Sequence, residues 1–187
     1  GGLSELNNVH VLSDGSILLV GSTWKQYILD YAEGPGANRI RMLKIKSDGS
    51  YDTSFVTEGE VISYDSILES AAQDYSAVQA DGKILITAIS TIDGQKGLII
   101  YRYNPNGSVD TTFGDGSGWV GLPINGWDFV SISSIQIQSN GKILIAGTSD
   151  ASEMLLRFNS NGTPDTTFGT KGNSIGYSAF ETVATEI

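Results

Sequence analysis

The sequence predicts an all-β fold built from tandem units, and three observations lead to this prediction. First, a phrase of the form Asp/Asn-Gly-x-Ile-Leu, ending in Gly or Ala, occurs at residues 14–21, 81–88 and 140–147. Second, a phrase containing Gly, Asp and Phe follows each copy, at residues 48–55, 106–114 and 161–169. Third, glycine-rich turns separate short apolar segments with almost no helical signal, and 23 of the 187 residues are glycine. Two phrases in fixed order, repeating every 55 to 67 residues, indicate an array of one supersecondary unit.

The first half of the third unit has the pattern of a β-hairpin. Residues 135–138 alternate apolar and polar side chains, which is typical of a half-buried strand. Asn140-Gly141 predicts a two-residue turn, because Asn and Gly both tolerate the positive φ that such a turn needs. Residues 143–147 are β-branched and apolar, so we expect the returning strand there.

The second half of the unit predicts two further strands. Residues 154–158 form a third apolar segment, and Asn161-Gly162 predicts a turn after it. The side chain of Asp165 can then accept backbone N–H groups and close a tight turn, with Phe168 pointing back as an anchor. A last short strand is expected within residues 173–178. Four antiparallel strands per unit indicate a blade of a β-propeller-like fold.

The repeat defines the expected domain organisation as one array. We expect blade 1 at about residues 6–65, blade 2 at about 75–122, blade 3 at about 132–178 and the start of a fourth unit at 181–187. Propellers typically close with 4–8 blades, so three blades do not easily form a ring. We therefore favour an ordered fragment of a longer propeller or chain. The alternative is that copies associate, for example as two sets of three blades.

A basic residue and an aspartate recur eight residues apart in every unit. The pairs are Lys44 and Asp52, Arg102 and Asp110, and Arg157 and Asp165. Each is followed by an anchor phenylalanine: Phe55, Phe113 and Phe168. We interpret each pair as a structural ion pair within its blade. A ring of charges lining a channel is the functional alternative.

These motifs together resemble the delta-sixty repeat of bacterial and phage proteins. The resemblance is carried by residues 141–147 and 157–169, and by their counterparts in unit two. Unit one departs from it, because Val56 follows Phe55 where the other units have Gly. The resemblance implies a β-propeller-like fold in large secreted, surface or virion-associated proteins. It implies no catalytic residues.

Composition narrows the possible functions. The formal net charge is −10, so the chain lacks the basic character that nucleic acid or an anionic membrane would attract. There is no cysteine, which removes disulfides, thiolate metal sites and Cys nucleophiles. His10 is the only histidine, and no Asp-x-Asp-x-Asp-Gly calcium pattern occurs. We expect no cofactor, no metal, no nucleic-acid partner and no membrane insertion.

The clearest break in the repeat is an insertion in unit one. Residues 22–38 replace a loop of a few residues and carry Trp24, Tyr27 and Tyr31. Insertions in repeat proteins fall in loops that often form the binding face, and aromatic side chains suit contact with a sugar or a protein. Trp127 is a further candidate between units two and three. The alternative is that these aromatic residues only pack against neighbouring blades.

The sequence therefore predicts a non-enzymatic structural or recognition module of a secreted, cell-surface or phage virion protein. Its expected partners are proteins, namely flanking blades of a parent chain, other copies or assembly neighbours, and possibly glycans. The alternative is a carboxylate-dependent glycan hydrolase or lyase. That alternative requires two of the residues Asp30, Glu33, Asp74 and Asp128 to converge in one pocket.

Overall fold

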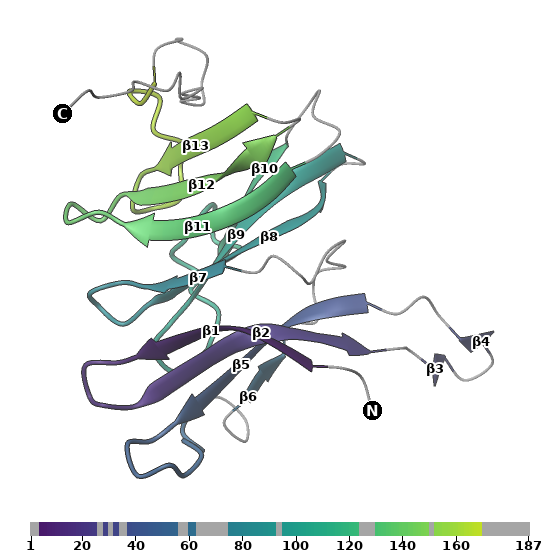
Figure 1. Cartoon of the computed structure of the whole chain (residues 1–187), viewed down its shortest axis with the longest axis vertical. Coiled ribbons are helices and arrows are strands. Elements are labelled where there is room, and N and C mark those ends of the chain that lie inside the picture. The colour runs from purple at the N-terminus through teal and green to yellow at the C-terminus, as the bar shows by residue number, and fades with distance from the viewer. Residues whose placement is uncertain are drawn as a thin grey trace, which may run out of the picture.

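The structure is a computed structural model, and the fold is all-β. It describes residues 4–25, 28–29, 32–33, 37–55, 60–62, 75–92, 95–123, 130–149 and 152–169. These residues form three antiparallel sheets of three or four strands and one two-stranded ribbon, and none of them is helical (Figure 1). Each sheet corresponds to one repeat unit and has the strand order of a propeller blade.

Blade 1 is a four-stranded sheet in the order β1-β2-β5-β6. Its strands are β1 (Ser4–Val11), β2 (Ile17–Lys25), β5 (Ala37–Ile45) and β6 (Glu60–Ile62). The insertion, residues 22–38, includes the end of β2 and the start of β5. Between them lies the ribbon of β3 (Ile28–Leu29) and β4 (Ala32–Glu33). The β3–β4 ribbon lies beyond one end of the sheet of blade 1 (Figure 1).

Blades 2 and 3 repeat this arrangement. Blade 2 contains β7 (Tyr75–Val78), β8 (Ile84–Ile92), β9 (Gln95–Tyr103) and β10 (Trp119–Pro123). Blade 3 contains β11 (Val130–Ile137), β12 (Ile143–Ser149) and β13 (Ser152–Phe158). The last strand expected at residues 173–178 and the start of a fourth unit at 181–187 lie outside the described residues.

The first hairpin of each unit differs from the two-residue turn that Asn-Gly predicts. The Gln138 N–H donates to Lys142 O at 2.9 Å, so three residues form the loop, and the Gly141 N–H donates to Gln138 O at 2.8 Å. Gly141 has φ 79°, as expected for the glycine that ends a three-residue hairpin loop. The prediction was wrong because the Asn140 side chain caps the loop, accepting the Lys142 N–H at 3.1 Å.

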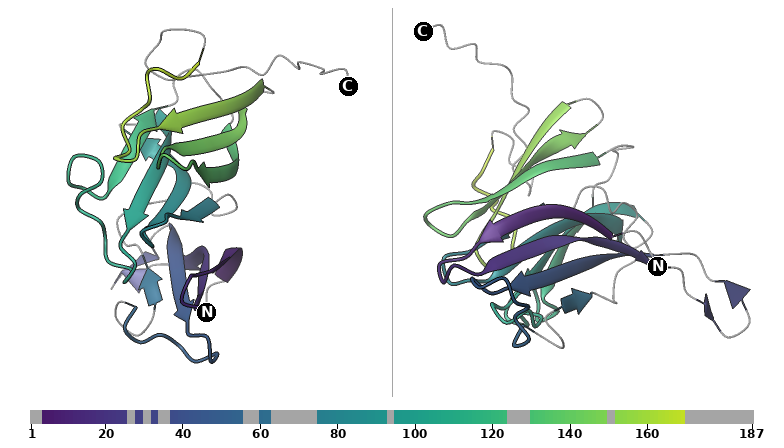
Figure 2. Two further views of the ribbon diagram at one scale, coloured as in Figure 1. Left: turned by 90° about the vertical axis from the view of Figure 1, so that its left-hand side faces the viewer. Right: turned by 60° about the horizontal axis from the view of Figure 1, so that its bottom comes forward.

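The blades pack face to face, and the hydrophobic core lies between them. The first strands β1, β7 and β11 lie side by side, so the three sheets follow one another in a row (Figures 1 and 2). One buried cluster joins blades 1 and 2 and includes Leu18, Met42, Phe55, Ile86 and Tyr101. A second joins blades 2 and 3 and includes Leu85, Phe113, Ile132, Ile145 and Phe158. We call each of these two interfaces a joint.

The anchor phenylalanine joins its blade to the next one rather than closing its own. Phe113 belongs to unit two, but it is fully buried in the cluster that contains β11, β12 and β13 residues. A Cβ built on Gly162 of blade 3 would lie 2.6 Å from the Phe113 ring, so only glycine fits there. Phe55 of blade 1 is equally buried in the cluster shared with blade 2. The phrase that ends each unit therefore forms the joint to the following unit.

Removing the Phe113 ring should destabilise the protein much more than removing the Phe168 ring. We expect Phe113→Ala to lower the free energy of unfolding by about 3–5 kcal/mol, because it leaves a cavity in the joint. Phe168→Ala is the matched control, since Phe168 occupies the same repeat position but is only half-buried. Urea unfolding of the two variants, at low protein concentration, measures the difference. Equal losses would contradict the assignment of Phe113 to the joint.

Candidate functional site

The second phrase of each unit builds a tight turn around an aspartate. In unit two, Asp110 Oδ1 accepts the Thr112 N–H at 3.0 Å and the Thr112 hydroxyl at 2.6 Å. The Phe113 N–H donates to Asp110 O at 3.1 Å, which places the ring at the end of the turn. Asp52 with Ser54, and Asp165 with Thr167, make the same contacts. A hydroxyl residue two positions after Asp is thus part of the turn.

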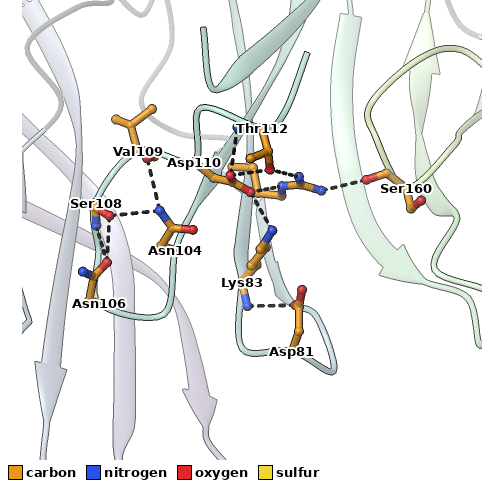
Figure 3. A network of polar contacts seen from close by, with 10 residues as sticks. Asp81, Lys83, Asn104, Asn106, Ser108, Val109, Asp110, Thr112 and Ser160 are labelled. Atoms are coloured by element: carbon orange, nitrogen blue, oxygen red, sulfur yellow. Dashed lines mark hydrogen bonds and ion pairs between the residues drawn. The ribbon is translucent and has the colours of Figure 1, made fainter. Parts of the chain in front are cut away.

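The other carboxylate oxygen binds two cations. Asp110 Oδ2 lies 2.6 Å from Arg102 Nε and 3.0 Å from Lys83 Nζ (Figure 3). The Arg102 guanidinium lies over the Phe113 ring, 4.4 Å from its centre, and its Nη1 donates to Ser160 O of blade 3 at 2.7 Å. Arg102 therefore links the aspartate turn of one blade to the backbone of the next blade.

Unit three repeats this network around Asp165. Its Oδ2 lies 2.6 Å from Lys142 Nζ and 2.7 Å from Arg157 Nε, and the guanidinium lies 4.2 Å from the centre of the Phe168 ring. The Arg–Asp pairs expected from the spacing of eight are formed in both units. The contacts of Lys83 and Lys142 with these aspartates were not predicted, although both lysines follow a turn glycine. Lysines at turns are usually exposed to solvent, so their repetition gave no sign of a buried partner.

Unit one keeps the aspartate turn but changes its cations. Lys44 replaces the arginine and lies 3.5 Å from Asp52 Oδ2 and 3.7 Å from Asp14 Oδ2. Ser16 stands where units two and three have a lysine. One cation thus faces two carboxylates in unit one, whereas two cations face one carboxylate in the other units. The ion pair of Asp52 is correspondingly longer than those of Asp110 and Asp165.

A groove opens at this joint. Its volume is about 560 Å³, and Lys44, Asp14, Phe55 and Pro105 are among the residues that line it. Pro105 holds the place that Ser160 holds in the next blade, where the Arg102 guanidinium binds the backbone. The shorter lysine at position 44 lacks the planar group with which arginine fills that space.

His10 lies beside the groove and links the first strands of two blades. Its Nε2 lies 2.8 Å from the Ser76 hydroxyl, so β1 and β7 are joined by a hydrogen bond between side chains. Burial lowers the pKa of His10 below its ordinary value, and the imidazole is neutral at pH 7. This hydrogen bond therefore ties β1 of blade 1 to β7 of blade 2.

The networks hold their carboxylates in the ionised form. Burial would raise the pKa of Asp110, but the hydrogen bonds from Thr112 and the nearby Lys83 and Arg102 outweigh it and hold that pKa far below its ordinary value. Lys142 is the largest cause of the same lowering at Asp165. Carboxylates that are bound on both oxygens and ionised do not provide a general acid.

Most of the residues expected to bind a ligand fall outside the described part of the chain. Trp24 lies in β2, where its backbone is opposite Asn38 of β5. Tyr27, Tyr31 and Trp127 lie outside the described residues. Among the described residues, the networks that the sequence predicts are those of the repeat positions.

Most of the acidic residues of the enzymatic alternative also lie outside the described part of the chain. Glu33 lies in β4, whereas Asp30, Asp74 and Asp128 lie outside the described residues. Within the described ranges, no three His, Asp or Glu side chains are grouped so that they could hold a metal ion. The same ranges contain no helix with the length and hydropathy needed to cross a membrane.

Comparison with known families identifies the repeat. A family model described as a domain of unknown function (DUF5122) beta-propeller matches residues 12–55, 79–113 and 138–168, which is more than half of the chain. Each matched segment begins just before the first hairpin turn and ends at the anchor phenylalanine. No curated protein matches the chain.

The low carboxylate pKa values predict loss of stability in acid. An unfolded Asp titrates at about pH 3.9. Because the folded-state pKa of Asp110 lies below this, its stabilisation is complete above that pH and is lost progressively as the pH falls below it. We expect the melting temperature to fall below about pH 4. Asp110→Asn should lower the free energy of unfolding by about 3 kcal/mol at pH 7. The melting temperature of this variant should also depend less on pH below about pH 4, and an unchanged dependence would contradict this.

Restoring the repeat residues in unit one should stabilise the protein. We expect Ser16→Lys with Lys44→Arg to raise the free energy of unfolding by about 1 kcal/mol, because the pair supplies the hydrogen bonds that the other joint has. Arg102→Lys is the reverse control and should lower it. Thermal unfolding measures both changes, and a destabilised double variant would refute this explanation of the groove.

Proposed function

The chain belongs to the DUF5122 β-propeller family, and from this premise we propose that it is a non-enzymatic structural or recognition module. Its blades provide a rigid support, and its loops are displayed for contact with proteins or glycans. The proposed setting is a secreted, cell-surface or phage virion protein, as the resemblance to the delta-sixty repeat suggests. The partners proposed are proteins, with glycans as a second class of ligand.

One observation carries this proposal: the recurrent aspartates are bound within the repeat networks. Each described Asp of the second phrase is bound on Oδ1 by its own turn and faces one or two cations through Oδ2. Since both oxygens of each carboxylate are occupied in this way, these groups are not available for acid or base chemistry. Function is then left to the parts that do not repeat, above all the insertion between β2 and β5.

The insertion also supports display. Its described β3–β4 ribbon lies beyond one end of the sheet of blade 1, so it adds surface outside the repeat (Figure 1). Tyrosine and tryptophan provide large contact areas at low entropic cost, which makes them frequent energetic centres of interfaces. Three such residues fall within the insertion: Trp24, Tyr27 and Tyr31.

Replacing tyrosines of the insertion should weaken binding without affecting folding. We expect Tyr27→Ala with Tyr31→Ala to weaken binding to the glycan or protein ligand by about 30-fold, the effect of losing an interface hot spot. Tyr51→Ala is the matched control, because Tyr51 is an exposed tyrosine of a repeat turn outside the insertion. A glycan array and immobilised cell-surface extract provide the ligands, and circular dichroism checks the fold.

Two results would count against the proposal. If Tyr51→Ala reduced binding as much as the double variant, the insertion would not be the contact surface. If the chain hydrolysed or cleaved a glycan on the array, the carboxylate-dependent enzyme would replace the display module.

A further inference from the structure

The groove between blades 1 and 2 lies where the next joint holds a guanidinium. In the joint between blades 2 and 3, Arg102 spans the two blades, and its Nη1 donates to Ser160 O at 2.7 Å (Figure 3). The first joint has Lys44 and Pro105 at the matching positions, and both residues line the groove. The second joint therefore shows which chemical group this space accommodates.

The groove is bounded by two neighbouring blades. Every residue that lines it belongs to the described part of the chain. Blade 1 contributes the end of β1, the turn after it and Lys44, and blade 2 contributes the turn between β7 and β8 and Pro105. Turns that the repeat itself builds therefore set the shape of the groove.

The groove offers a carbonyl oxygen that lacks the donor present in the next joint. Ser160 O accepts a hydrogen bond from Arg102. At the matching position, no group among the described residues donates to Pro105 O. A donor that enters the groove can therefore bind this carbonyl without displacing a contact of the protein.

The groove also has an unbalanced negative charge. Its lining contains Asp14 and Lys44, and Lys44 Nζ is shared between Asp14 Oδ2 at 3.7 Å and Asp52 Oδ2 at 3.5 Å. Both distances exceed the roughly 2.8 Å of a charge-assisted hydrogen bond. Charged residues in the turns beside the groove balance one another, with two of each sign: Lys46, Asp48, Asp81 and Lys83.

Asp14 can be approached by a ligand. Its Oδ1 accepts the Ser16 N–H at 2.9 Å and so belongs to the turn. Its Oδ2 has only the long contact with Lys44, and the side chain is 61% exposed. One carboxylate oxygen is therefore open on the solvent side of the groove.

These acceptors suit a guanidinium better than an ammonium. A guanidinium is planar and has five donors, so one edge can bind a carboxylate while another reaches a carbonyl. The ammonium of Lys44 already shows the limit of a point charge here, because it makes two long contacts instead of one short one. The apolar side chains of Leu12 and Val78 can cover the methylene stem of an arginine.

We propose that this groove binds a guanidinium group carried by a ligand, either an exposed arginine of a partner protein or a small guanidinium compound. The guanidinium pairs with Asp14 Oδ2 and donates to Pro105 O, in the place that Arg102 holds in the next joint. The site is separate from the insertion. It extends the proposed recognition function to a second surface with a defined chemistry.

The experiment follows amide chemical shifts of the isotope-labelled full chain by NMR. The probe is N-acetyl-arginine amide, and N-acetyl-lysine amide is the control ligand with the same charge. We expect saturable shifts around Ser13, Asp14 and Gly82, which line the groove, with a dissociation constant on the order of 1 mM. The lysine probe should bind at least about tenfold more weakly.

A third probe distinguishes the two sources of the guanidinium. It is a blocked pentapeptide with a central arginine between glycines. Tighter binding of this peptide than of N-acetyl-arginine amide supports an arginine of a partner protein, and equal binding supports a small guanidinium compound.

Two matched variants test the role of the carboxylate. Asp14→Asn should weaken binding of the arginine probe at least about tenfold, because it removes the charge. The turn should persist, since Asn140 holds this position in unit three and accepts the Lys142 N–H. Asp48→Asn is the control. It makes the same change of charge at a turn residue that does not line the groove, so the affinity should be unchanged.

A third variant fills the site from within. Lys44→Arg places a guanidinium of the chain itself beside Pro105 O, as Arg102 is placed beside Ser160 O, so binding of the arginine probe should be lost. Urea unfolding confirms that each variant folds.

Three results overturn the proposal. They are the absence of saturable shifts with the arginine probe, equal binding of the lysine probe, and undiminished binding by the Asp14→Asn or Lys44→Arg chain. Each leaves the display function standing, because the tyrosine variants of the insertion test that function separately.

Discussion

The aspartate at the end of each unit uses its two carboxylate oxygens for different contacts, and the array depends on this division. Oδ1 of Asp110 closes the turn that places Phe113, and Oδ2 holds Arg102 and Lys83. The arginine then lies over the phenylalanine and binds the backbone of the next blade. One side chain therefore couples local turn formation to packing between blades. Because both cations are largely buried, removing the carboxylate leaves them uncompensated, which costs more than forming the pair contributes.

The joint also explains why the first unit differs from the others. With Lys44 and Ser16 in place of arginine and lysine, Asp52 has only a 3.5 Å contact through Oδ2. The groove appears at this joint, and so does the hydrogen bond between His10 and Ser76. The irregular features of the molecule thus gather in unit one, where the insertion between β2 and β5 also lies.

Much of the fold followed from short-range patterns. The Asn-Gly and Asp-Gly turns, the strand alternation and the eight-residue Arg–Asp spacing act between near neighbours, so the sequence reveals them directly. The three-residue hairpin was not predicted, because it depends on two features that a two-residue turn does not need. The Asn140 side chain accepts the Lys142 N–H, and Gly141 alone adopts a positive φ at the end of the loop. The role of Lys142 was missed for another reason. Its partner Asp165 is 23 residues away, and nothing local indicates that contact.

The sequence by itself determined the unit: its strands, its turns and the residues that would pair within it. These depend on backbone preferences and on contacts between residues close along the chain. Only the tertiary structure decided where Phe113 and Arg102 act, since both belong to blade 2 and reach blade 3. It also decided which equivalent positions are buried, as Leu6 and Ile132 show. The reason is that burial depends on which surfaces pack together, and the sequence of a single unit does not specify this.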